Sequence, residues 1–308
     1  MAGTAGVIWT STLALGLRKT LDGIVDDTTD QMDSNQVARQ YMRVESMDSA
    51  YEDYTSFAGP AYASEKPEGT DIAVGTMDMG PVLRIFARTF ALRMLITEEA
   101  LEDNKYPQLV RLAKMCKRAI YNTRNLDATS ILVNAWDTNY VGADGLPLCS
   151  ASHTLPGGGT YSNTLSVPMS PSVQALIVVK SAIRKLPALD GSPQQNLMPK
   201  KVVCPVEQES VWQEIMGSKM RPDAGNFAAI NVTNRWQMED TFANVYWDNT
   251  TTNWGVTTNA DDPILFKDRR APRGKSWVDE EKGIMSFSCS DRHGMGWPDP
   301  RAFFGSQA

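Results

Sequence analysis

The sequence has little of what catalysis, metal binding or membrane insertion requires. Its 308 residues include only two histidines and four cysteines, and no two cysteines are spaced as a CxxC pair. A structural metal site needs several such ligands at a recognisable spacing, and a cofactor site needs a binding motif, so we expect neither. No apolar run approaches the roughly 20 residues of a membrane-spanning helix. These absences argue against a metalloprotein and against a membrane protein.

The few cysteines also bear on the compartment. They are widely separated along the chain, at Cys116, Cys149, Cys204 and Cys289. One lies in a helical pattern and two lie in strand patterns, which indicates small buried hydrophobic residues in a reducing compartment. The apolar stretch of residues 7–17 is followed, and not preceded, by Arg18 and Lys19, which is the wrong order for a secretion signal. We therefore expect a cytosolic product.

An excess of basic residues is absent as well. The formal net charge is -6 and the pI is about 5.1, which argues against a protein that grips nucleic acid through phosphate contacts. The one dense basic cluster, RRAPRGK at residues 269–275, is predicted to be a solvated turn. Apolar residues make up 42% of the chain and charged residues 21%, which is typical of a folded globular protein.

The strongest secondary-structure signals lie between residues 82 and 140. Residues 82–96 form an acid-free run, VLRIFARTFALRMLI, which predicts a long strand. Residues 106–136 carry an apolar stripe at helical spacing, with a proline at a tolerated position near the start, and predict one long helix. At 1.5 Å per residue this helix would be on the order of 45 Å long. An element of that length is suited to spanning distance and touching neighbours.

The segment before the long strand, residues 51–81, has no core pattern of its own. It carries six acids against one lysine, Lys66. Long loops without a core are uncommon in a compact domain and are usually functional or disordered. The strand-like runs at each end predict a stretched two-stranded hairpin. A lone hairpin is not stable in water, so we expect it to lie on something else, such as another subunit.

The arginines of the predicted strand have two interpretations. Arg84 and Arg88 share one face with apolar residues, and Arg93 lies on the other. In the first interpretation, they belong to a solvated edge strand whose charges deter aggregation. Alternatively, they face an acid-rich loop of a neighbouring chain, where charge complementarity would fix the register. Thr97, followed by two acids, is predicted to cap a helix. The candidate subunit-interface residues are Lys66, Arg84, Arg88, Arg93, Glu98 and Glu99.

The remainder of the chain predicts an α+β domain. Ser170 and Pro171 are expected to cap a helix that extends to Arg184, a short buried strand follows at residues 200–205, and another helix ends at Gly217. The string PGGGT, residues 156–160, is not a phosphate loop because no Lys-Ser or Lys-Thr follows the glycines. Near the C-terminal end, Met285, Phe287 and Cys289 alternate with serines and predict a half-buried strand.

Catalysis has weak support. A Ser- or Cys-based hydrolase needs a base close to its nucleophile and a group that orients the base. Cys149 and His153 are close in sequence, but they lie in a loop without a nucleophile-elbow pattern. We therefore expect no enzyme and no catalytic residues. A Cys/His hydrolase that uses these two residues stays open as an alternative of another class.

The order of the parts resembles a known family. It runs from an N-terminal arm through an acidic loop, an arginine-bearing strand, one long helix and an α+β domain to a returning strand. This order is similar to the major capsid proteins of tailed bacteriophages, the Hong Kong 97-type fold, and looks most like the major head subunits of Mu-like phages. The closest local similarities are GADGLPLCSASHTLPGGGTYSN, residues 142–163, and DRHGMGWPDPRAFFGS, residues 291–306.

The resemblance implies a role for each segment, and these roles are expectations. Residues 1–50 would be the N-terminal arm and residues 51–96 the E-loop, which reaches over an adjacent subunit. Residues 97–143 would hold the spine helix of the peripheral domain. Residues 144–275 would form the axial domain, and residues 276–308 would return to the peripheral sheet.

The resemblance also implies a structural protein that builds a shell. Its subunits would form pentamers and hexamers of an icosahedral head that encloses double-stranded DNA without sequence-specific contacts. Scaffolding, portal and decoration proteins would be further partners, and no membrane would be involved. The protein would be found in the virion capsid, after assembly in the host cytoplasm.

Two features limit the resemblance. Only about fifty residues precede the expected E-loop, so, if scaffolding is used, we expect it to be either a separate protein or already removed. Some relatives link subunits covalently through Lys and Asn, but no positional match carries that chemistry to Lys66. An encapsulin-type nanocompartment, which uses the same fold to hold protein cargo, stays open as an alternative function.

Overall fold

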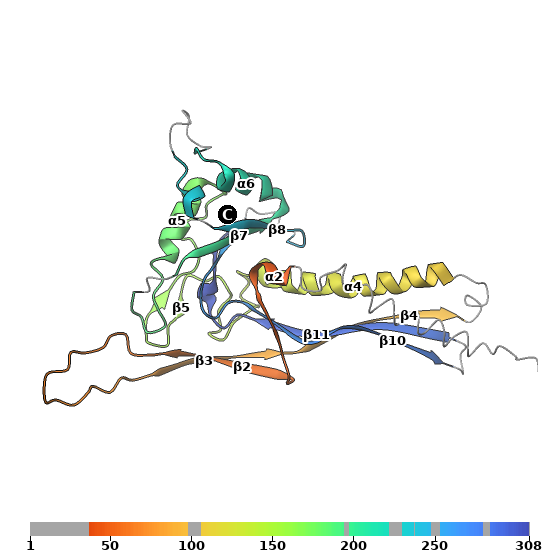
Figure 1. The fold of residues 1–308 in the computed structure, drawn as a ribbon, viewed down its shortest axis with the longest axis horizontal. Coiled ribbons are helices and arrows are strands. Elements are labelled where there is room, and N and C mark those ends of the chain that lie inside the picture. Colours follow the sequence, from red (N-terminus) through yellow and green to blue (C-terminus); the bar gives the residue numbers. More distant parts are fainter. Residues whose placement is uncertain are drawn as a thin grey trace, which may run out of the picture.

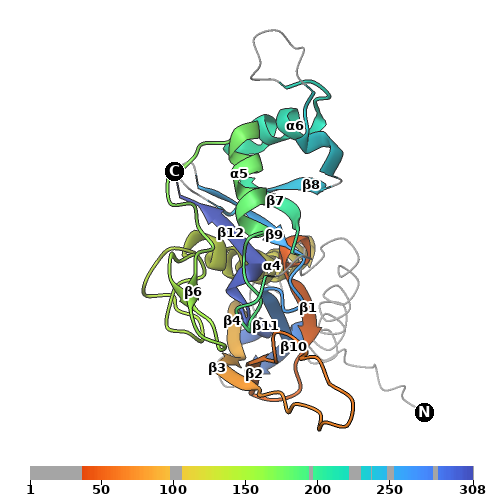
Figure 2. The same ribbon diagram turned by 90° about the vertical axis from the view of Figure 1, so that its left-hand side faces the viewer.

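Figure 1 shows a computed structural model of the chain, which describes residues 37–97, 106–193, 197–221, 230–236, 238–247, 253–279 and 284–307. Long strands and one long helix form an elongated layer. A hairpin extends from one end of this layer, and a smaller α+β unit stands on its upper side (Figure 1). In the end-on view of Figure 2, the hairpin lies at the bottom and α5 and α6 lie at the top.

The elongated layer is a four-stranded sheet covered by the long helix. Its strand order is β1 (Arg43–Ser46), β10 (Leu265–Asp279), β11 (Ile284–Gly296) and β4 (Arg88–Thr97). Helix α4 (Tyr106–Val133) lies on one face, because its apolar residues recur at helical spacing and meet alternate residues of β11. The buried contact joins Ala113, Cys116 and Ile120 to Ile96, Met285, Phe287 and Cys289.

The predicted helix and strands of this layer are confirmed with corrections. The helix ends at Val133, slightly earlier than expected. The long strand is interrupted at Ala87, whose N–H donates to the carbonyl of Ala50, so β4 follows a separate strand, β3. The predicted helix cap was wrong at Thr97, which ends β4. Glu98 and Glu99 lie outside the described residues.

The predicted solvated turn at residues 269–275 was also wrong. These residues belong to β10 and pair with β11. The pairing register shifts between Asp268 and Arg270, and again between Arg270 and Arg273. Such bulges let Pro272 sit in a strand without a lost ladder hydrogen bond. Polar composition suggested a turn, whereas pairing with a long partner strand decides the conformation.

The smaller unit is a second sheet packed against two helices. Its strand order is β12 (Phe303–Ser306), β9 (Trp254–Thr258), β7 (Pro199–Pro205) and β8 (Glu239–Asn244). Helices α5 (Val173–Ile183) and α6 (Glu209–Gly217) bury their apolar faces against it, and the rings of Trp212 and Trp254 lie 4.6 Å apart. Ser172, and not the expected Ser170, caps α5, because its side chain accepts from the Ala175 N–H.

Short elements complete the chain. Helix α2 (Ala38–Tyr41) packs beside α4, and Tyr41 donates its hydroxyl to the carbonyl of Ala128. Strands β5 (His153–Thr154) and β6 (Thr160–Tyr161) pair across the predicted PGGGT loop, where Gly158 and Gly159 have positive φ angles. The described residues also include the 3-10 turns η2 (Val206–Gln208), η3 (Thr233–Trp236) and η4 (Pro300–Ala302).

The predicted hairpin is confirmed. Strand β2 (Tyr51–Ala58) pairs antiparallel with β3 (Asp78–Phe86), and the loop between them projects away from the rest of the chain (Figure 1). The base of the hairpin packs on β10 and β11 through Met47, Ile85 and Leu265. The buried Lys267 ammonium binds Glu45 and, at 3.1 Å, Glu52. These contacts fix the direction in which the hairpin leaves the body.

Two glycines make this attachment possible. An added Cβ at Gly294 would lie 2.3 Å from the carbonyl oxygen of Phe86, and one at Gly296 would lie 3.0 Å from Ile85. Both residues are on β11, so the backbone of β3 rests directly on the sheet there. The two glycines of the string HGMG, near the C-terminal end, therefore pack against a hairpin that lies more than two hundred residues earlier in the sequence.

The two segments that carry the local family similarity pack against each other. Asn163, fully buried, donates its amide to the carbonyls of Leu148, Pro300 and Phe303, at 2.6, 2.9 and 3.1 Å. The N–H of Gly305 donates to the Asn163 carbonyl, and a Cβ at Gly305 would meet Trp136 and Cys149. Their shared role is structural, since they join the long helix to the second sheet.

A buried ionic network ties α4 to the sheet. The Arg124 guanidinium, 1% exposed, lies 2.6 Å from Asp291 and 2.9 Å from Asp268. His293 sits between two carboxylates, 2.6 Å from Asp291 and 3.0 Å from Asp127. Its ring is stacked between those of two phenylalanines, with centroid distances of 4.7 and 5.0 Å. The network therefore joins α4, β10 and β11.

The expected domain limits differ from the sheet membership. Residues 265–275 were expected in the axial domain, whereas β10 lies in the first sheet. Strand β12 was expected to return to the peripheral sheet, whereas it lies at the edge of the second. The first strand of the layer, β1, comes from the expected arm. The domain boundaries themselves stay a prediction.

We predict that Gly294→Ala weakens the hairpin attachment. The new methyl group would overlap the Phe86 carbonyl, and overpacking of this kind costs about 1–3 kcal/mol. Urea unfolding monitored by circular dichroism would measure the loss, and limited proteolysis would report a loosened hairpin. Gly59→Ala is the matched control, because a Cβ there meets open space. Equal stability of the two variants would contradict the close packing.

We also predict that His293 stabilises the fold most at mildly acidic pH. Burial lowers its pKa, but the hydrogen bonds with Asp127 and Asp291 outweigh burial and the net pKa is raised. Its contribution is therefore complete below its unfolded pKa of about 6.5 and is lost as pH rises through the folded pKa.

The measurement compares His293→Gln with the unaltered chain. Their difference in free energy of unfolding should be largest below the unfolded pKa of about 6.5 and should shrink as the pH rises above it. The comparison cancels the titration of other groups, such as Cys116, whose pKa is lowered to about 7 mainly by the hydrogen bond with Cys289. A difference that stays constant with pH would show that the pKa of His293 is the same in the folded and the unfolded chain, against this prediction.

Candidate assembly surfaces

The hairpin tip is the most exposed apolar part of the described chain. Ile72 is 76% exposed and Val74 is 94% exposed, with Tyr62 and Met77 nearly as open. Within the loop, the hydrogen bonds of Thr70 to the Pro67 carbonyl and the positive φ of Gly69 form a local turn. Exposed apolar patches of this kind mark protein–protein contact sites.

The predicted interface residues fall in different places. Lys66 is exposed in the hairpin loop. Arg84 lies on β3 and binds Asp53 of β2 through two hydrogen bonds of 2.6 and 2.7 Å. Arg88 binds Asp127 of α4 at 2.6 Å. Arg84 and Arg88 thus have partners within the same chain, which the sequence did not show.

Arg93 lies on the opposite face of the sheet from α4. It donates to the hydroxyl of Ser286 at 2.6 Å, and its guanidinium lies over the ring of Trp277, 5.1 Å from the centroid. Strand β4 is at the edge of its sheet, in agreement with the edge-strand interpretation. The two interpretations of the arginines are therefore compatible, because an edge strand can also present charge to a neighbour.

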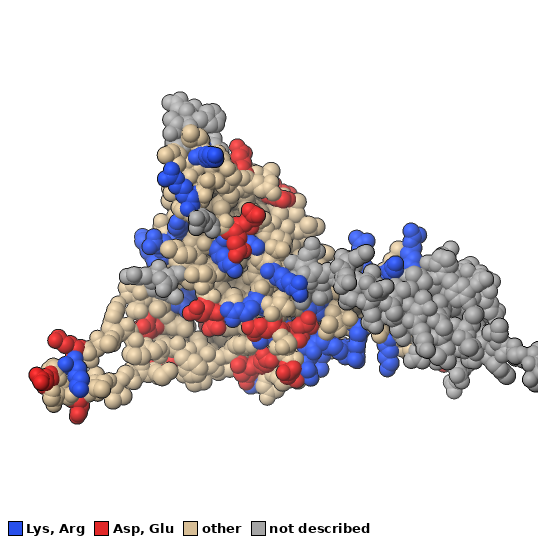
Figure 3. Space-filling model, in the orientation of Figure 1, with Lys and Arg blue, Asp and Glu red and all other residues tan. Residues whose placement is uncertain are grey.

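Sequence reasoning missed the neighbours of Arg93. On the same face, β10 contributes Arg270, Arg273 and Lys275, and β11 contributes Arg292. We call these five residues the arginine face. Figure 3 shows Lys and Arg side chains on the underside of the strands beside Asp and Glu side chains near the middle of the molecule, and both kinds at the far end of the hairpin. The string RRAPRGK contains three of these basic residues, but only the pairing of the strands shows that they share a face with Arg93.

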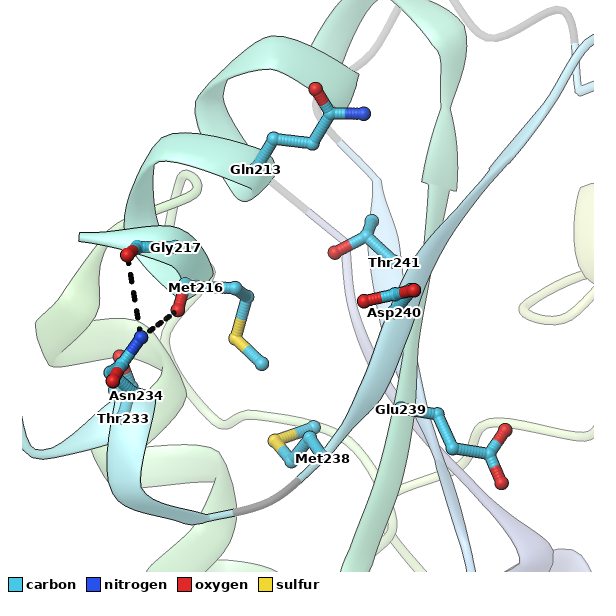
Figure 4. Close-up of a pocket in the computed structure, with 9 residues that line it drawn as sticks. All are labelled: Gln213, Met216, Gly217, Thr233, Asn234, Met238, Glu239, Asp240 and Thr241. Carbon is cyan, nitrogen blue, oxygen red and sulfur yellow. Dashed lines mark hydrogen bonds between the residues drawn. The ribbon is translucent and has the colours of Figure 1, made fainter.

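A pocket of about 500 Å³ lies between α6 and β8 (Figure 4). Asn234 uses its amide to donate to the carbonyls of Met216 and Gly217, at 2.8 and 3.4 Å, which closes the end of α6. The carboxylate of Glu239 points away from the pocket and binds Lys200 and Lys201. The lining residues do not converge on a point where a substrate could be held.

The alternative Cys/His pair does not have the geometry of a hydrolase. His153 is fully buried, with Nδ1 2.5 Å from Asp144 and Nε2 3.3 Å from the Leu148 carbonyl. Both ring nitrogens are thus engaged away from Cys149. Burial raises the pKa of the Cys149 thiol, and the hydrogen bond from the Gly305 N–H only partly offsets this. A nucleophilic thiol requires the opposite shift.

Other site types are also missing from the part of the chain that the structure describes. Within these residues, no group of three or more His, Cys, Asp or Glu side chains could hold a metal ion. No described helix combines the length and the apolar character that a membrane crossing demands. The candidate functional features that stand out are therefore surfaces, namely the hairpin tip and the arginine face.

Solved structures share this fold at low sequence identity. The capsid of cyanophage P-SCSP1u has a TM-score of 0.57 and 10% identity, covering 87% of this chain and 86% of that chain. The capsid of Myoviridae phage XM1 has a TM-score of 0.55 and 9% identity, with coverages of 88% and 92%. A virus-like particle from Pyrococcus furiosus has a TM-score of 0.50 and 9% identity, with coverages of 94% and 98%.

These structures establish the fold, and a family model establishes the family. The predicted α+β fold of the Hong Kong 97 type is confirmed. No curated protein sequence matches the chain. The family model described as phage capsid protein matches residues 82–305, from the hairpin's second strand to the last strand. The chain therefore belongs to the phage capsid protein family and is a structural protein of a phage shell.

Proposed function

We propose that copies of this chain assemble into the icosahedral head shell of a tailed bacteriophage that encloses double-stranded DNA. The observation that carries this proposal is the hairpin, whose apolar tip is left exposed by the part of the chain that the structure describes. Removing apolar surface from water favours association, by about 25 cal/mol for each Å² buried. A hairpin of this kind is stable only against a partner, and in a shell the nearest partner is another copy.

The hairpin would act as the E-loop expected from the sequence. Its direction is fixed by the contacts of Gly294 and Lys267 at its base, so it projects as a defined arm. Copies arranged around fivefold and sixfold axes would each cover the next with this arm. The second sheet with α5 and α6 would form the axial domain that meets its copies at these axes.

We assign a role to each predicted interface residue from the contacts that it makes within the chain. Arg84 and Arg88 would act indirectly, since Arg84 rigidifies the hairpin through Asp53 and Arg88 holds β4 to α4 through Asp127. Lys66 and Arg93 are exposed and would face neighbouring copies. Glu98 and Glu99 keep their proposed interface role from the sequence alone.

No catalytic step is included in this proposal. The raised pKa of the Cys149 thiol and the engaged nitrogens of His153 support a purely structural role. Scaffolding, portal and decoration proteins would be further partners, and assembly would take place in the host cytoplasm before the protein becomes part of the virion. DNA would be enclosed without base-specific contacts.

We predict that shortening the hairpin abolishes shell formation without unfolding the chain. Residues 60–76 would be replaced by an Asn-Gly turn, which suits a two-stranded hairpin. These residues are exposed, so both sheets should keep their stability. Negative-stain electron microscopy and sedimentation would show closed shells for the unaltered chain and small species for the variant.

The matched control keeps the length of the loop. Replacing Tyr62, Ile72, Val74 and Met77 with serine should also block assembly, because these changes remove the exposed apolar side chains and keep the loop. Normal shells from the shortened variant would refute the overlapping arm.

Particles from the natural source also separate the alternatives. Nuclease-protected double-stranded DNA inside them supports a phage head, whereas a protein cargo supports an encapsulin-type compartment.

We predict that Cys149 resists alkylation in the folded chain. Its thiol is buried and its pKa is raised, so little thiolate is present at neutral pH. Treatment with iodoacetamide followed by peptide mass spectrometry should show modification only after denaturation. Rapid labelling of Cys149 in the native protein, or hydrolytic activity lost in Cys149→Ser, would favour the hydrolase alternative.

A further inference from the structure

Two of the four cysteines meet in the contact between the long helix and the first sheet. Cys116 lies on α4 and Cys289 lies on β11, and both belong to the buried cluster that joins these elements. Cys116 is 1% exposed and Cys289 is 2% exposed. Cys149 and Cys204 belong to two other buried clusters, neither of which holds a second cysteine. All four cysteines are free thiols, and only Cys116 and Cys289 share a cluster.

The strand register and the helix place the two sulfur atoms beside each other. Cys289 pairs with Leu92 across β11 and β4, and the Cα atoms of such antiparallel partners are about 5 Å apart. The Cys116 Sγ lies 3.8 Å from the Leu92 carbonyl oxygen, so α4 sets this thiol over the pair. Cys116 also forms hydrogen bonds with the side chain and the backbone of Cys289. A disulfide holds its sulfur atoms closer than a hydrogen bond does, so forming one would draw α4 toward β11.

The two thiols differ in acidity, as a nucleophile and its resolving partner must. The hydrogen bond with Cys289 lowers the pKa of Cys116 to about 7, against the opposing effect of burial. The same hydrogen bond, together with burial, raises the pKa of Cys289. A large fraction of Cys116 is therefore thiolate at neutral pH, the form that reacts with oxidants, while Cys289 keeps its proton. Burial raises the pKa of Cys204, which has no such neighbour, to about 12.

A bond at this place would hold α4 at a second point. Arg124, which the two carboxylates of the sheet hold, lies about two helical turns beyond Cys116. Around Cys116 the helix meets the sheet through apolar side chains. A disulfide would add a covalent link there. It would also close a long loop that contains the second sheet apart from β12, and such closure stabilises a fold by restricting the unfolded chain.

We propose that Cys116 and Cys289 are a redox pair that a peroxide converts into a disulfide, which locks α4 to β11. The bond itself requires only the folded chain. Its use rests on the proposed function. In the host cytoplasm the thiols stay reduced, whereas a shell released from the cell meets oxidising conditions, where the link strengthens each subunit.

The oxidation consumes one molecule of hydrogen peroxide, which is small enough to enter when the contact opens locally. The Cys116 thiolate attacks one peroxide oxygen. The O–O bond breaks, an S–O bond forms, and the departing hydroxide takes up the proton that Cys116 released. The Cys289 sulfur then attacks the sulfenic sulfur of Cys116, so that the S–S bond forms, the S–O bond breaks, and the hydroxyl leaves with the Cys289 proton as water. Two thiols and one peroxide give one disulfide and two waters, and two electrons pass from sulfur to oxygen.

Peptide mapping of the full chain tests the pair. The protein is purified with a reductant, freed of it, treated with hydrogen peroxide, alkylated after denaturation and digested without reduction. Mass spectrometry should show the peptide of Cys116 joined to the peptide of Cys289, with Cys149 and Cys204 alkylated. The oxidised chain should unfold about 5 °C or more above the reduced chain, and dithiothreitol should reverse this shift. Non-reducing electrophoresis should show a single chain, because the link is internal.

The variants separate the pair from the other thiols. Cys289→Ala removes the resolving thiol, so peroxide should leave Cys116 as a sulfenic acid or its higher oxides, with no link and no rise in unfolding temperature. Cys204→Ala is the matched control, because it removes a buried thiol outside the pair. It should keep both the link and the shift. If Cys289→Ala does not fold, the peptide map and the reversible shift of the unaltered chain decide the question.

The outcomes separate this inference from the proposed function. A link between Cys116 and Cys289 with the reversible shift supports the redox pair, whether or not shells form. Oxidation of Cys116 without a link, a link to another cysteine, or a link that leaves the unfolding temperature unchanged overturns it. Normal shells whose two thiols stay unlinked after peroxide overturn the inference and leave the proposed function intact. A linked chain that forms no shells under any condition supports the inference, while the proposed function fails.

Discussion

A guanidinium buried between two carboxylates determines how the rest of the molecule is arranged. Arg124 on α4 can keep its charge inside the protein only where Asp268 of β10 and Asp291 of β11 converge on it. A buried ion that loses its partner is strongly destabilising, so few other positions of the helix are tolerated. His293 and Asp127 extend this constraint to a second point on α4, and Arg88 extends it to β4. The long helix and the sheet therefore form one stiff platform.

The stiff platform holds the base of the hairpin in a fixed direction. Strand β3 rests on Gly294 and Gly296 and continues into β4, so the arm is an extension of the same sheet layer. Lys267 holds β1 and β2 together at its base. Because the base is fixed, the conformational entropy lost on docking is confined mainly to the loop at the tip, residues 59–77, which lies outside the paired strands.

Much of this arrangement could be predicted from the sequence, and the failures have physical causes. The long helix, the hairpin and the α+β unit follow from local periodicity, which acts over a few residues. The strand at residues 269–275 could not be found in this way, because its polar composition resembles a turn and its conformation comes from pairing with β11. The partners of Arg84 and Arg88 were missed for the same reason, since Asp127 lies 39 residues from Arg88. The arginine face required the register of three strands before it could be recognised.

The same distinction explains how a fold persists at about one-tenth sequence identity. A core needs apolar residues of suitable size at the right period, and many sequences meet that condition. A contact between identical copies needs only that its two sides fit each other, and both sides are encoded in one chain. A change on one side of such a contact can therefore be matched by a change on the other side without any effect on the fold. Residues at such contacts are free to differ between shells, whereas the fold that brings the two sides together is not.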